Sequence, residues 1–151
     1  MIIRRAEEKD LKEIYRIEVN SFKDPYPYGL LKAFLYHPGV YLVIIEDEKI
    51  IGYSIGIIRF KDLGHIISIA IDKDYRGKGF GKKLLKETID NLIKMGVKKI
   101  RIEVRESNEI AINLYKKFGF IEKEKIKEYY PNGESAIVMF LDVAKYLQKL
   151  E

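Results

Sequence analysis

The sequence predicts an α/β protein in which helices cover a mixed β-sheet, organised as one domain over residues 1–151. Apolar segments of strand length alternate with amphipathic segments of helical length, and this alternation is typical of α/β folds. At the centre of the chain, the apolar run 66–71 is followed by a glycine-rich loop and a helical pattern, which indicates a strand–helix–strand crossover. Short polar turns elsewhere predict antiparallel hairpins, so the sheet is expected to combine both strand directions.

Seven strands and four helices are expected, in the order β-α-α-β-β-β-α-β-α-β-β. The predicted strands cover residues 1–6, 40–46, 50–60, 66–71, 98–104, 120–130 and 135–143. The predicted helices cover residues 10–22 and 29–36, a segment from the glycine loop to Gly96, and residues 108–118. Periodicity decides each assignment, because buried residues recur about every two positions along a strand and about every 3.6 along a helix.

The first predicted helix carries a capping signal at its start. Asp10 is the expected N-cap, and Glu13 completes a capping box with it. Leu11, Ile14 and Tyr15 are spaced to form the inner face of this helix. The segment that follows is expected to be a loop, because each of its two prolines disfavours helix at the preceding residue.

Composition narrows the class of protein. Hydrophobic residues make up 47% and charged residues 34%, and no apolar run is long enough to cross a bilayer. The chain starts directly with a strand pattern, so no signal peptide is expected. With no cysteine and two histidines, we expect a cytoplasmic protein without disulfides, thiol catalysis or a metal site. The net charge of +5 is mild, and Lys and Glu are interspersed, so neither nucleic acid nor membrane is an expected partner.

The glycine loop Arg76-Gly77-Lys78-Gly79-Phe80-Gly81 predicts a phosphate-binding turn before a helix. A helix start presents unpaired N–H groups and a partial positive charge, and glycines let the backbone approach a phosphate closely. The loop is not a P-loop, which needs a glycine at position 76 and Ser or Thr at 83. It also lacks the third glycine of a dinucleotide-binding fingerprint, since Lys82 stands there.

A second informative stretch covers residues 102–120. Glu103 lies on a predicted strand between two apolar residues, so its carboxylate is expected at a covered face or cleft rather than in open water. Asn108 is suited to cap the next helix, and Gly119 to end it. Tyr115 lies on the apolar face of that helix, where a tyrosine taken alone is more often a core residue than a catalyst.

Together these motifs resemble the GNAT N-acetyltransferases. Arg76-x-x-Gly79-x-Gly81 matches the [RQ]-x-x-G-x-[GA] signature with which that family holds the pyrophosphate of acetyl-CoA. The stretch 102–120, with Gly64-His65-Ile66 and the hairpin around Tyr129-Tyr130, resembles the protein N-terminal acetyltransferases, both RimI-type and archaeal or eukaryotic catalytic subunits. The resemblance covers nearly the whole chain. It implies a GNAT fold with splayed central strands and acetyl transfer from acetyl-CoA to the N-terminal α-amino group of proteins or peptides.

The resemblance also implies roles for individual residues. It assigns coenzyme binding to Ile69, Ala70, Ile71, Arg76, Gly77, Lys78, Gly79, Phe80, Gly81, Lys82, Asn108 and Tyr115. Glu103 is the expected general base, acting through one water, and His65 is either a second base or a structural residue at the strand end. Tyr115 is the expected acid, because a tyrosine with a pKa of about 10 can protonate a thiolate whose conjugate acid titrates near about 8.5.

Four tyrosines are expected to bind the acceptor. Tyr26 and Tyr28 on one side and Tyr129 and Tyr130 on the other would form two stiff walls that hold a chain end. The simpler alternative is that these tyrosines form only a hydrophobic hairpin face. Asp24 is the nearest counterpart of a glutamate with which some relatives select acidic N-termini, and no such selectivity is assumed.

Other functions stay open at this point. A GNAT fold also suits acetylation of a small amine, such as a polyamine or aminoglycoside, or of a protein lysine. A regulatory module that binds acyl-CoA without turnover is a third alternative, although retention of both Glu103 and Tyr115 argues against it. Proximity to the ribosome and an auxiliary subunit are compatible with the family. The preferred first residues and the oligomeric state do not follow from the sequence.

Overall fold

The computed structural model describes residues 1–150, which form a seven-stranded mixed sheet in the order β1-β2-β3-β4-β5-β7-β6. The strands are β1 (Ile2–Arg5), β2 (Gly39–Glu46), β3 (Lys49–Arg59), β4 (Leu63–Ile71), β5 (Lys99–Arg105), β6 (Ile121–Ile126) and β7 (Ala136–Asp142). The helices are α1 (Leu11–Ser21), α2 (Tyr28–Ala33), α3 (Phe80–Lys94), α4 (Glu109–Phe118) and α5 (Val143–Lys149). The α/β class and the strand–helix–strand crossover predicted from the sequence are therefore confirmed.

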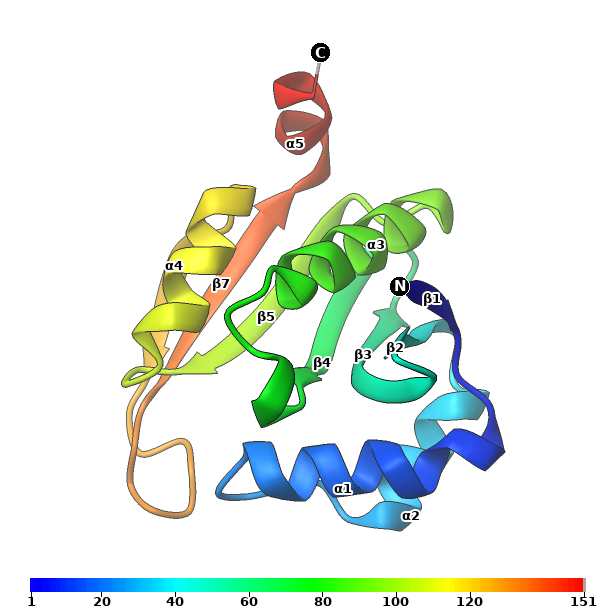
Figure 1. Ribbon diagram of the computed structural model, residues 1–151. Helices are drawn as coiled ribbons and strands as arrows, with labels where there is room; N and C mark the ends of the chain where they lie inside the picture. The colour runs from blue at the N-terminus through cyan, green and yellow to red at the C-terminus, as the bar shows by residue number, and fades with distance from the viewer. Residues whose placement is uncertain (151) are drawn as a thin grey trace.

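Helices cover both faces of the sheet (Figure 1). Helices α1 and α2 pack on one face over a buried cluster that includes Ile14 and Tyr53. Helix α3 packs on the other face over a second cluster that includes Ile44 and Leu84. A sheet buried on both faces needs apolar residues on both sides of its strands, which explains the near-continuous apolar runs of the central strands. None of the described helices has the length and apolar character needed to span a bilayer.

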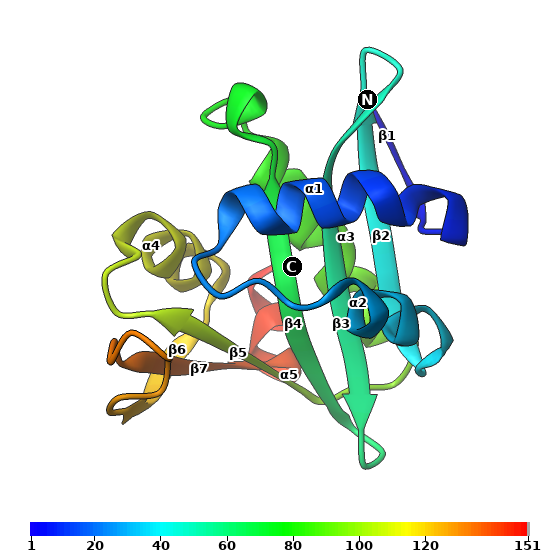
Figure 2. The same cartoon turned by 90° about the horizontal axis from the view of Figure 1, so that it is seen from below.

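The two central strands separate after a short parallel pairing. Strands β4 and β5 are paired from Leu63 opposite Lys99 to Ile66 opposite Ile102, and no further. Beyond this point β4 continues to Ile71 along β3, whereas β5 follows β7, so the strands diverge (Figure 2). This divergence confirms the expected splayed strands, and it leaves the second half of β4 without a partner on the β5 side.

The start of α1 is capped differently from the prediction. A short helical turn, Glu8–Asp10, precedes α1. Asp10 therefore stands at the predicted N-cap position of α1, but its side chain makes no cap hydrogen bond to that helix. Its carboxylate accepts hydrogen bonds from the backbone N–H of Glu7 at 2.8 Å and from Arg4 at 2.7 and 2.9 Å. Glu13 instead pairs with Arg16 at 2.9 Å on the surface. The predicted Asp10–Glu13 capping box is therefore wrong, because the capping box is formed by Glu7 and Asp10, three residues earlier in the chain.

The inner face of α1 is also rotated relative to the prediction. Leu11, Ile14, Ile17 and Glu18 are buried, whereas Tyr15 is 37% exposed. The buried positions repeat at three- and four-residue intervals, and Tyr15 falls at the flank of this stripe. A polar residue, Glu18, thus takes the buried position that an apolar pattern alone did not reveal.

The C-terminal region differs from the expected simple hairpin. Strand β6 ends at Ile126 and not at residue 130, because the chain turns through a loop before β7 begins. An additional helix, α5, follows β7 and was not predicted. The carboxylate of Asp142 caps it by accepting from the backbone N–H of Lys145 at 3.2 Å, and Val143 and Tyr146 are buried one turn apart.

Candidate active site

A cleft of about 490 Å³ opens where β4 and β5 diverge. It is lined by Glu18, Ser21, Phe22, Lys23, Asp24 and Tyr26, by residues 66–69 and 102–105, by Ser107, Asn108, Ala111 and Tyr115, and by Tyr129 and Tyr130. The structure therefore brings together the two principal catalytic candidates, Glu103 and Tyr115, with three of the four tyrosines predicted to bind the acceptor.

Glu103 forms a close pair with His65. The strand pairing sets His65 opposite Arg101, so that Glu103, two residues further along β5, faces the same side. The His65 Nε2 atom lies 2.5 Å from Glu103 Oε2, and Arg101 Nε donates to the other carboxylate oxygen at 3.3 Å. Burial alone raises the pKa of Glu103, but the hydrogen bond and charge of His65 and the charge of Arg101 outweigh it, and the net pKa is lowered. Glu103 is therefore ionised at neutral pH, as a general base must be.

In the described part of the chain, the side chain of His65 makes this single polar contact. Its Nδ1 atom is buried and has no hydrogen-bond partner among residues 1–150. Because Nε2 must carry a proton to donate to the carboxylate, Nδ1 is the nitrogen that differs between neutral and charged imidazole. His65 does not itself line the cleft, so it reaches the site through Glu103.

Tyr115 enters the cleft from α4. The helix is positioned by Asn108, whose side-chain oxygen accepts from the backbone N–H of Ala111 at 3.2 Å, and it ends at Gly119 with φ of 109°. The Tyr115 ring packs against Phe120 with ring centroids 5.8 Å apart. Burial raises the pKa of the Tyr115 hydroxyl, which therefore stays protonated at neutral pH, the state required of a proton donor.

The glycine loop presents an open backbone at the start of α3. Gly77 and Gly79 have φ of 76° and 87°, a region that side chains with a Cβ rarely adopt. A Cβ atom built at either residue has no neighbouring atom within 4 Å, so the space above the loop is open. Gly81 is already helical, and a Cβ there meets Ile71 Cγ1 at 3.7 Å. The first turn of α3 thus exposes N–H groups over which a phosphate can sit.

Arg76, the first residue of the motif, makes two hydrogen bonds to neighbouring elements. Its Nε donates to the backbone oxygen of Ile71 at 2.8 Å, and its Nη2 donates to the hydroxyl of Ser21 at 3.1 Å. The guanidinium therefore ties the glycine loop to the end of β4 and to the last residue of α1. Within the same loop, the Lys78 Nζ atom lies over the Tyr75 ring, 5.5 Å from its centroid.

Of the four predicted acceptor-binding tyrosines, Tyr28 is not brought to the cleft. It is 44% exposed at the start of α2 and packs edge-on against Tyr15, with centroids 5.6 Å apart. Tyr129 and Tyr130 also meet edge-on, at 5.1 Å, but at the cleft. Burial raises the pKa of Tyr130 to about 12 against the opposing charge of Arg105, so its hydroxyl is a hydrogen-bond donor over the physiological range.

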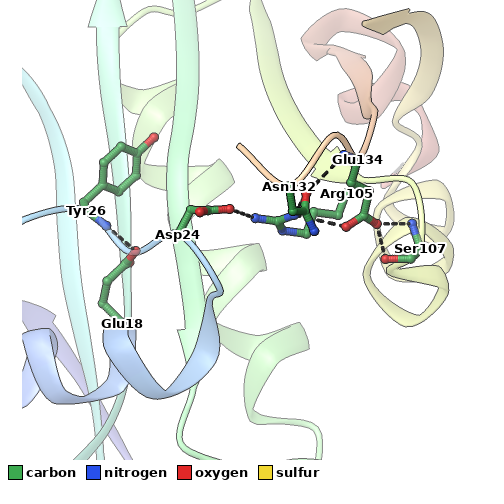
Figure 3. Close-up of polar contacts among 7 residues, drawn as sticks. All are labelled: Glu18, Asp24, Tyr26, Arg105, Ser107, Asn132 and Glu134. Atoms are coloured by element: carbon green, nitrogen blue, oxygen red, sulfur yellow. Dashed lines mark hydrogen bonds and ion pairs between the residues drawn. The ribbon is translucent and has the colours of Figure 1, made fainter. Parts of the chain in front are cut away.

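Sequence reasoning missed Glu18, a buried carboxylate that lines the cleft. Its Oε2 accepts from the backbone N–H of Tyr26 at 3.0 Å (Figure 3), and its Oε1 accepts from the hydroxyls of Ser68, at 2.9 Å, and Tyr53. These bonds fasten the loop that carries Tyr26 to β3 and β4. The available signal was spacing: Glu18 follows Ile14 by one helical turn, on the face that must be buried.

The divergent strands, the open glycine loop and a cleft lined by both Glu103 and Tyr115 are the features expected of an enzyme that transfers an acyl group from a coenzyme A thioester. Residues 8–120 match the family described as Acetyltransferase (GNAT) family, and the chain belongs to this family. It is thus an acetyltransferase that uses acetyl-CoA.

Relatives extend the match over nearly the whole chain. The [ribosomal protein bS18]-alanine N-acetyltransferase of Haemophilus influenzae is 38% identical over 142 residues, covering 91% of this chain and 96% of its own. The N-alpha-acetyltransferase of Sulfurisphaera tokodaii is 33% identical over 150 residues, covering 91% of this chain and 90% of its own. The crystal structure of the ribosomal-protein-S18-alanine N-acetyltransferase from Escherichia coli superposes with a TM-score of 0.87 at 32% identity, covering 94% and 93% of the two chains.

Acetyl-CoA fits the residues present. The open space above Gly77 and Gly79 and the N–H groups at the start of α3 suit a pyrophosphate. Beyond Ile66, the β5-facing edge of β4 has unpaired backbone suited to an extended pantetheine arm. When bound, the coenzyme supplies the activated acetyl group as a thioester. Coenzyme contacts of Asn108 and Tyr115, which both line the cleft, remain predictions.

Proposed function

We propose that this enzyme acetylates the N-terminal α-amino group of proteins or peptides. The proposal rests chiefly on one observation: the carboxylate of Glu103 lies in a cleft shared with Tyr26, Tyr129 and Tyr130 and with the acid Tyr115. The printed names of the Haemophilus and Sulfurisphaera relatives, which describe acetylation of an alanine of a ribosomal protein and of α-amino groups, support it. A cytoplasmic setting, close to the ribosome or with an auxiliary subunit, belongs to the same proposal.

In this proposal each side chain moves or holds a proton at a stated atom. A carboxylate oxygen of Glu103 accepts a proton from the acceptor ammonium through one water, and His65 stabilises the charge of that carboxylate through Nε2. The Tyr115 hydroxyl donates its proton to the departing sulfur. Tyr26, Tyr129 and Tyr130 hold the first residues of the acceptor by stacking and by hydrogen bonds to its backbone.

The basicity of the acceptor favours an α-amine over a lysine. An α-amino group has a pKa of about 7.7–8.0, against about 10.4 for a lysine side chain. At pH 7 roughly a tenth of the first is neutral, compared with less than about one part in a thousand of the second. A carboxylate whose pKa is lowered is a weak base, so Glu103 suits the more acidic ammonium.

A small cationic acceptor is less well supported by the cleft. Acidic residues free to bind a polyamine would favour it, and three acids do line the cleft: Glu18, Asp24 and Glu103. Glu18 is occupied by two hydroxyls and one N–H group, and Asp24 pairs with Arg105. The aromatic residues of the cleft therefore support a peptide acceptor more strongly than its acidic residues support a polyamine.

Two peptides that differ only at the N-terminus and at one internal position test the proposal. One has a free N-terminus and no lysine, and the other has a blocked N-terminus and one internal lysine. Release of free thiol from acetyl-CoA is measured for each, with spermidine as a third acceptor. We expect the free N-terminus to give the highest kcat/KM. Faster acetylation of the blocked peptide or of spermidine contradicts the proposal.

A further inference from the structure

Arg105, the last residue of β5, joins the two walls of the cleft (Figure 3). On one side its Nη2 pairs with the carboxylate of Asp24, in the loop between α1 and α2. On the other side its Nη1 donates to Glu134 Oε2 at 3.0 Å and to Asn132 Oδ1 at 3.2 Å, both in the loop between β6 and β7. These two loops are 81 and 27 to 29 residues away from Arg105 in sequence, and the guanidinium connects them directly.

The bridge is also attached to the tyrosines of the cleft. The Arg105 guanidinium lies 3.9 Å from the centroid of the Tyr130 ring, and the backbone N–H of Tyr130 donates to the backbone oxygen of Glu134 at 3.1 Å. Asp24 stands two residues before Tyr26, whose own N–H is held by Glu18 at 3.0 Å. One wall tyrosine on each side is therefore linked to the bridge, Tyr130 by direct contact of its ring with the guanidinium and Tyr26 by its position two residues after Asp24.

Several features make this bridge stronger than an ordinary surface ion pair. The side chains of Arg105 and Glu134 are only 14% and 17% exposed. Glu134 also accepts from the backbone N–H of Ser107 at 3.1 Å and from its hydroxyl, so its loop is anchored at the start of α4 as well. The planar guanidinium presents separate N–H groups to the two carboxylates at once, which a lysine ammonium at the same place cannot do with equal geometry.

We infer that the Asp24–Arg105–Glu134 bridge holds the two walls at a fixed spacing that admits the end of a peptide chain and excludes a lysine within a chain. This inference rests on the proposed function and identifies the residues that produce its selectivity. An N-terminus approaches Glu103 with the chain leaving in one direction only. A lysine side chain brings with it a backbone that continues both ways across the mouth of the cleft, between Tyr26 and Tyr130. If the walls cannot separate, that second direction is blocked.

Arg105 is in this view a positioning residue, and its loss should change selectivity more than stability or coenzyme binding. We would compare Arg105→Gln and Asp24→Asn with wild type, using the free-N-terminus peptide and the blocked lysine peptide described above. The control is Lys86→Gln, which removes an ion pair with Asp90 of 2.6 Å on the exposed face of α3. Thermal midpoints and calorimetric affinity for acetyl-CoA are measured for every variant.

The two bridge variants are expected to lower the ratio of kcat/KM for the free N-terminus to that for lysine by about tenfold or more, a typical effect of losing one pocket contact. KM for the free-N-terminus peptide should rise more than kcat falls, because positioning is lost and chemistry is not. Acetyl-CoA affinity, and every property of the control, should stay unchanged.

Asp24→Asn keeps the test decisive if Arg105→Gln does not fold, because Asp24 is one-third exposed on a loop. An unchanged selectivity ratio in a folded bridge variant overturns the inference while the proposed function stands. A wild-type enzyme that already prefers the lysine peptide overturns the proposed function, whatever the variants do. The two failures are thus distinguishable.

Discussion

The Nε2 atom of His65 lies 2.5 Å from Oε2 of Glu103, next to the last paired residues of β4 and β5, Ile66 and Ile102. The two side chains that the sequence offered as separate base candidates are therefore one hydrogen-bonded pair. Only Glu103 lines the cleft, which makes it the member that can reach the acceptor.

Replacing Glu103 tests this assignment. Glu103→Gln should lower kcat/KM at pH 7 by about 10²–10⁴-fold, the usual range for a general base. The variant should recover partly at high pH, because more of the acceptor amine is then already neutral. His65→Gln is the matched comparison, since its amide can still donate to the carboxylate, and it should lose less activity. Equal rates for wild type and Glu103→Gln would show that Glu103 is only a packing residue.

The pH profile of the wild-type enzyme follows from the same pair. Because the pKa of Glu103 is lowered, its carboxylate is ionised throughout the range above its ordinary value of about 4.5. The rise of kcat/KM between pH 6 and about 8 should therefore track deprotonation of the α-amine. An acceptor whose amine is less basic should shift this rise in kcat/KM to lower pH. A rise at the same pH for both acceptors contradicts the assignment.

Tyr115 should affect turnover and not coenzyme affinity. Tyr115→Phe removes the hydroxyl and keeps the ring that packs against Phe120. We expect kcat to fall by about 10²–10⁴-fold, with little change in calorimetric affinity for acetyl-CoA. Tyr129→Phe, at a half-exposed residue that lines the cleft, serves as the comparison and should act mainly on the KM of the peptide. A wild-type kcat in Tyr115→Phe would show that Tyr115 has only a packing role in the core.

Two substitutions of Gly79 distinguish the effect of charge in the glycine loop from the effect of backbone strain. Gly79→Gln and Gly79→Glu place side chains of similar shape at a φ of 87°, where an L residue costs about 1–2 kcal/mol. Both should lose similar stability in urea unfolding. Gly79→Glu should bind acetyl-CoA more weakly than Gly79→Gln at pH 7, because its carboxylate faces the pyrophosphate. Equal affinities would argue against a phosphate site at this loop.

Glu134 should make stability depend on acid pH. Hydrogen bonds from Ser107, reinforced by Arg105, lower the pKa of Glu134 to about 2 from its ordinary value of 4.5. A carboxyl whose pKa is lower in the folded state stabilises the fold above its unfolded value and loses this effect as the pH falls. The difference in thermal midpoint between wild type and Glu134→Gln should be full above about pH 5 and shrink toward pH 2. Glu122→Gln, on the exposed strand β6, is the control and should show no such trend.

Glu18 should matter for the acceptor and not for the coenzyme. Glu18→Gln exchanges one acceptor oxygen for a donor, which leaves a buried N–H or hydroxyl group unpaired at a cost of about 1–3 kcal/mol. The KM for the peptide should rise, because Tyr26 is no longer held, while acetyl-CoA affinity stays the same. Tyr53→Phe, which removes one of the three donors to Glu18, should have the smaller effect. An unchanged peptide KM in a folded Glu18→Gln contradicts this role.

The sequence by itself determined those features that depend on near neighbours in the chain. The apolar run of β4, the glycine spacing before α3 and the capping by Asn108 are local, because periodicity and backbone conformation act within a few residues. The mixed sheet and its central crossover followed from these elements and their order. The family signatures placed Glu103 and Tyr115 in the candidate site. The cap of α1 and helix α5 were also local, but their signals overlapped with neighbouring patterns.

Tertiary structure alone decided which side chains share the cleft. The contact of His65 with Glu103 depends on the register between two strands, and the burial of Glu18 on how α1 lies over β3 and β4. Tyr28 points to Tyr15, and Arg105 reaches loops on both sides, for the same reason. Such contacts join residues tens of positions apart, and their geometry is set by the packing of whole elements. No local pattern in the chain encodes that packing.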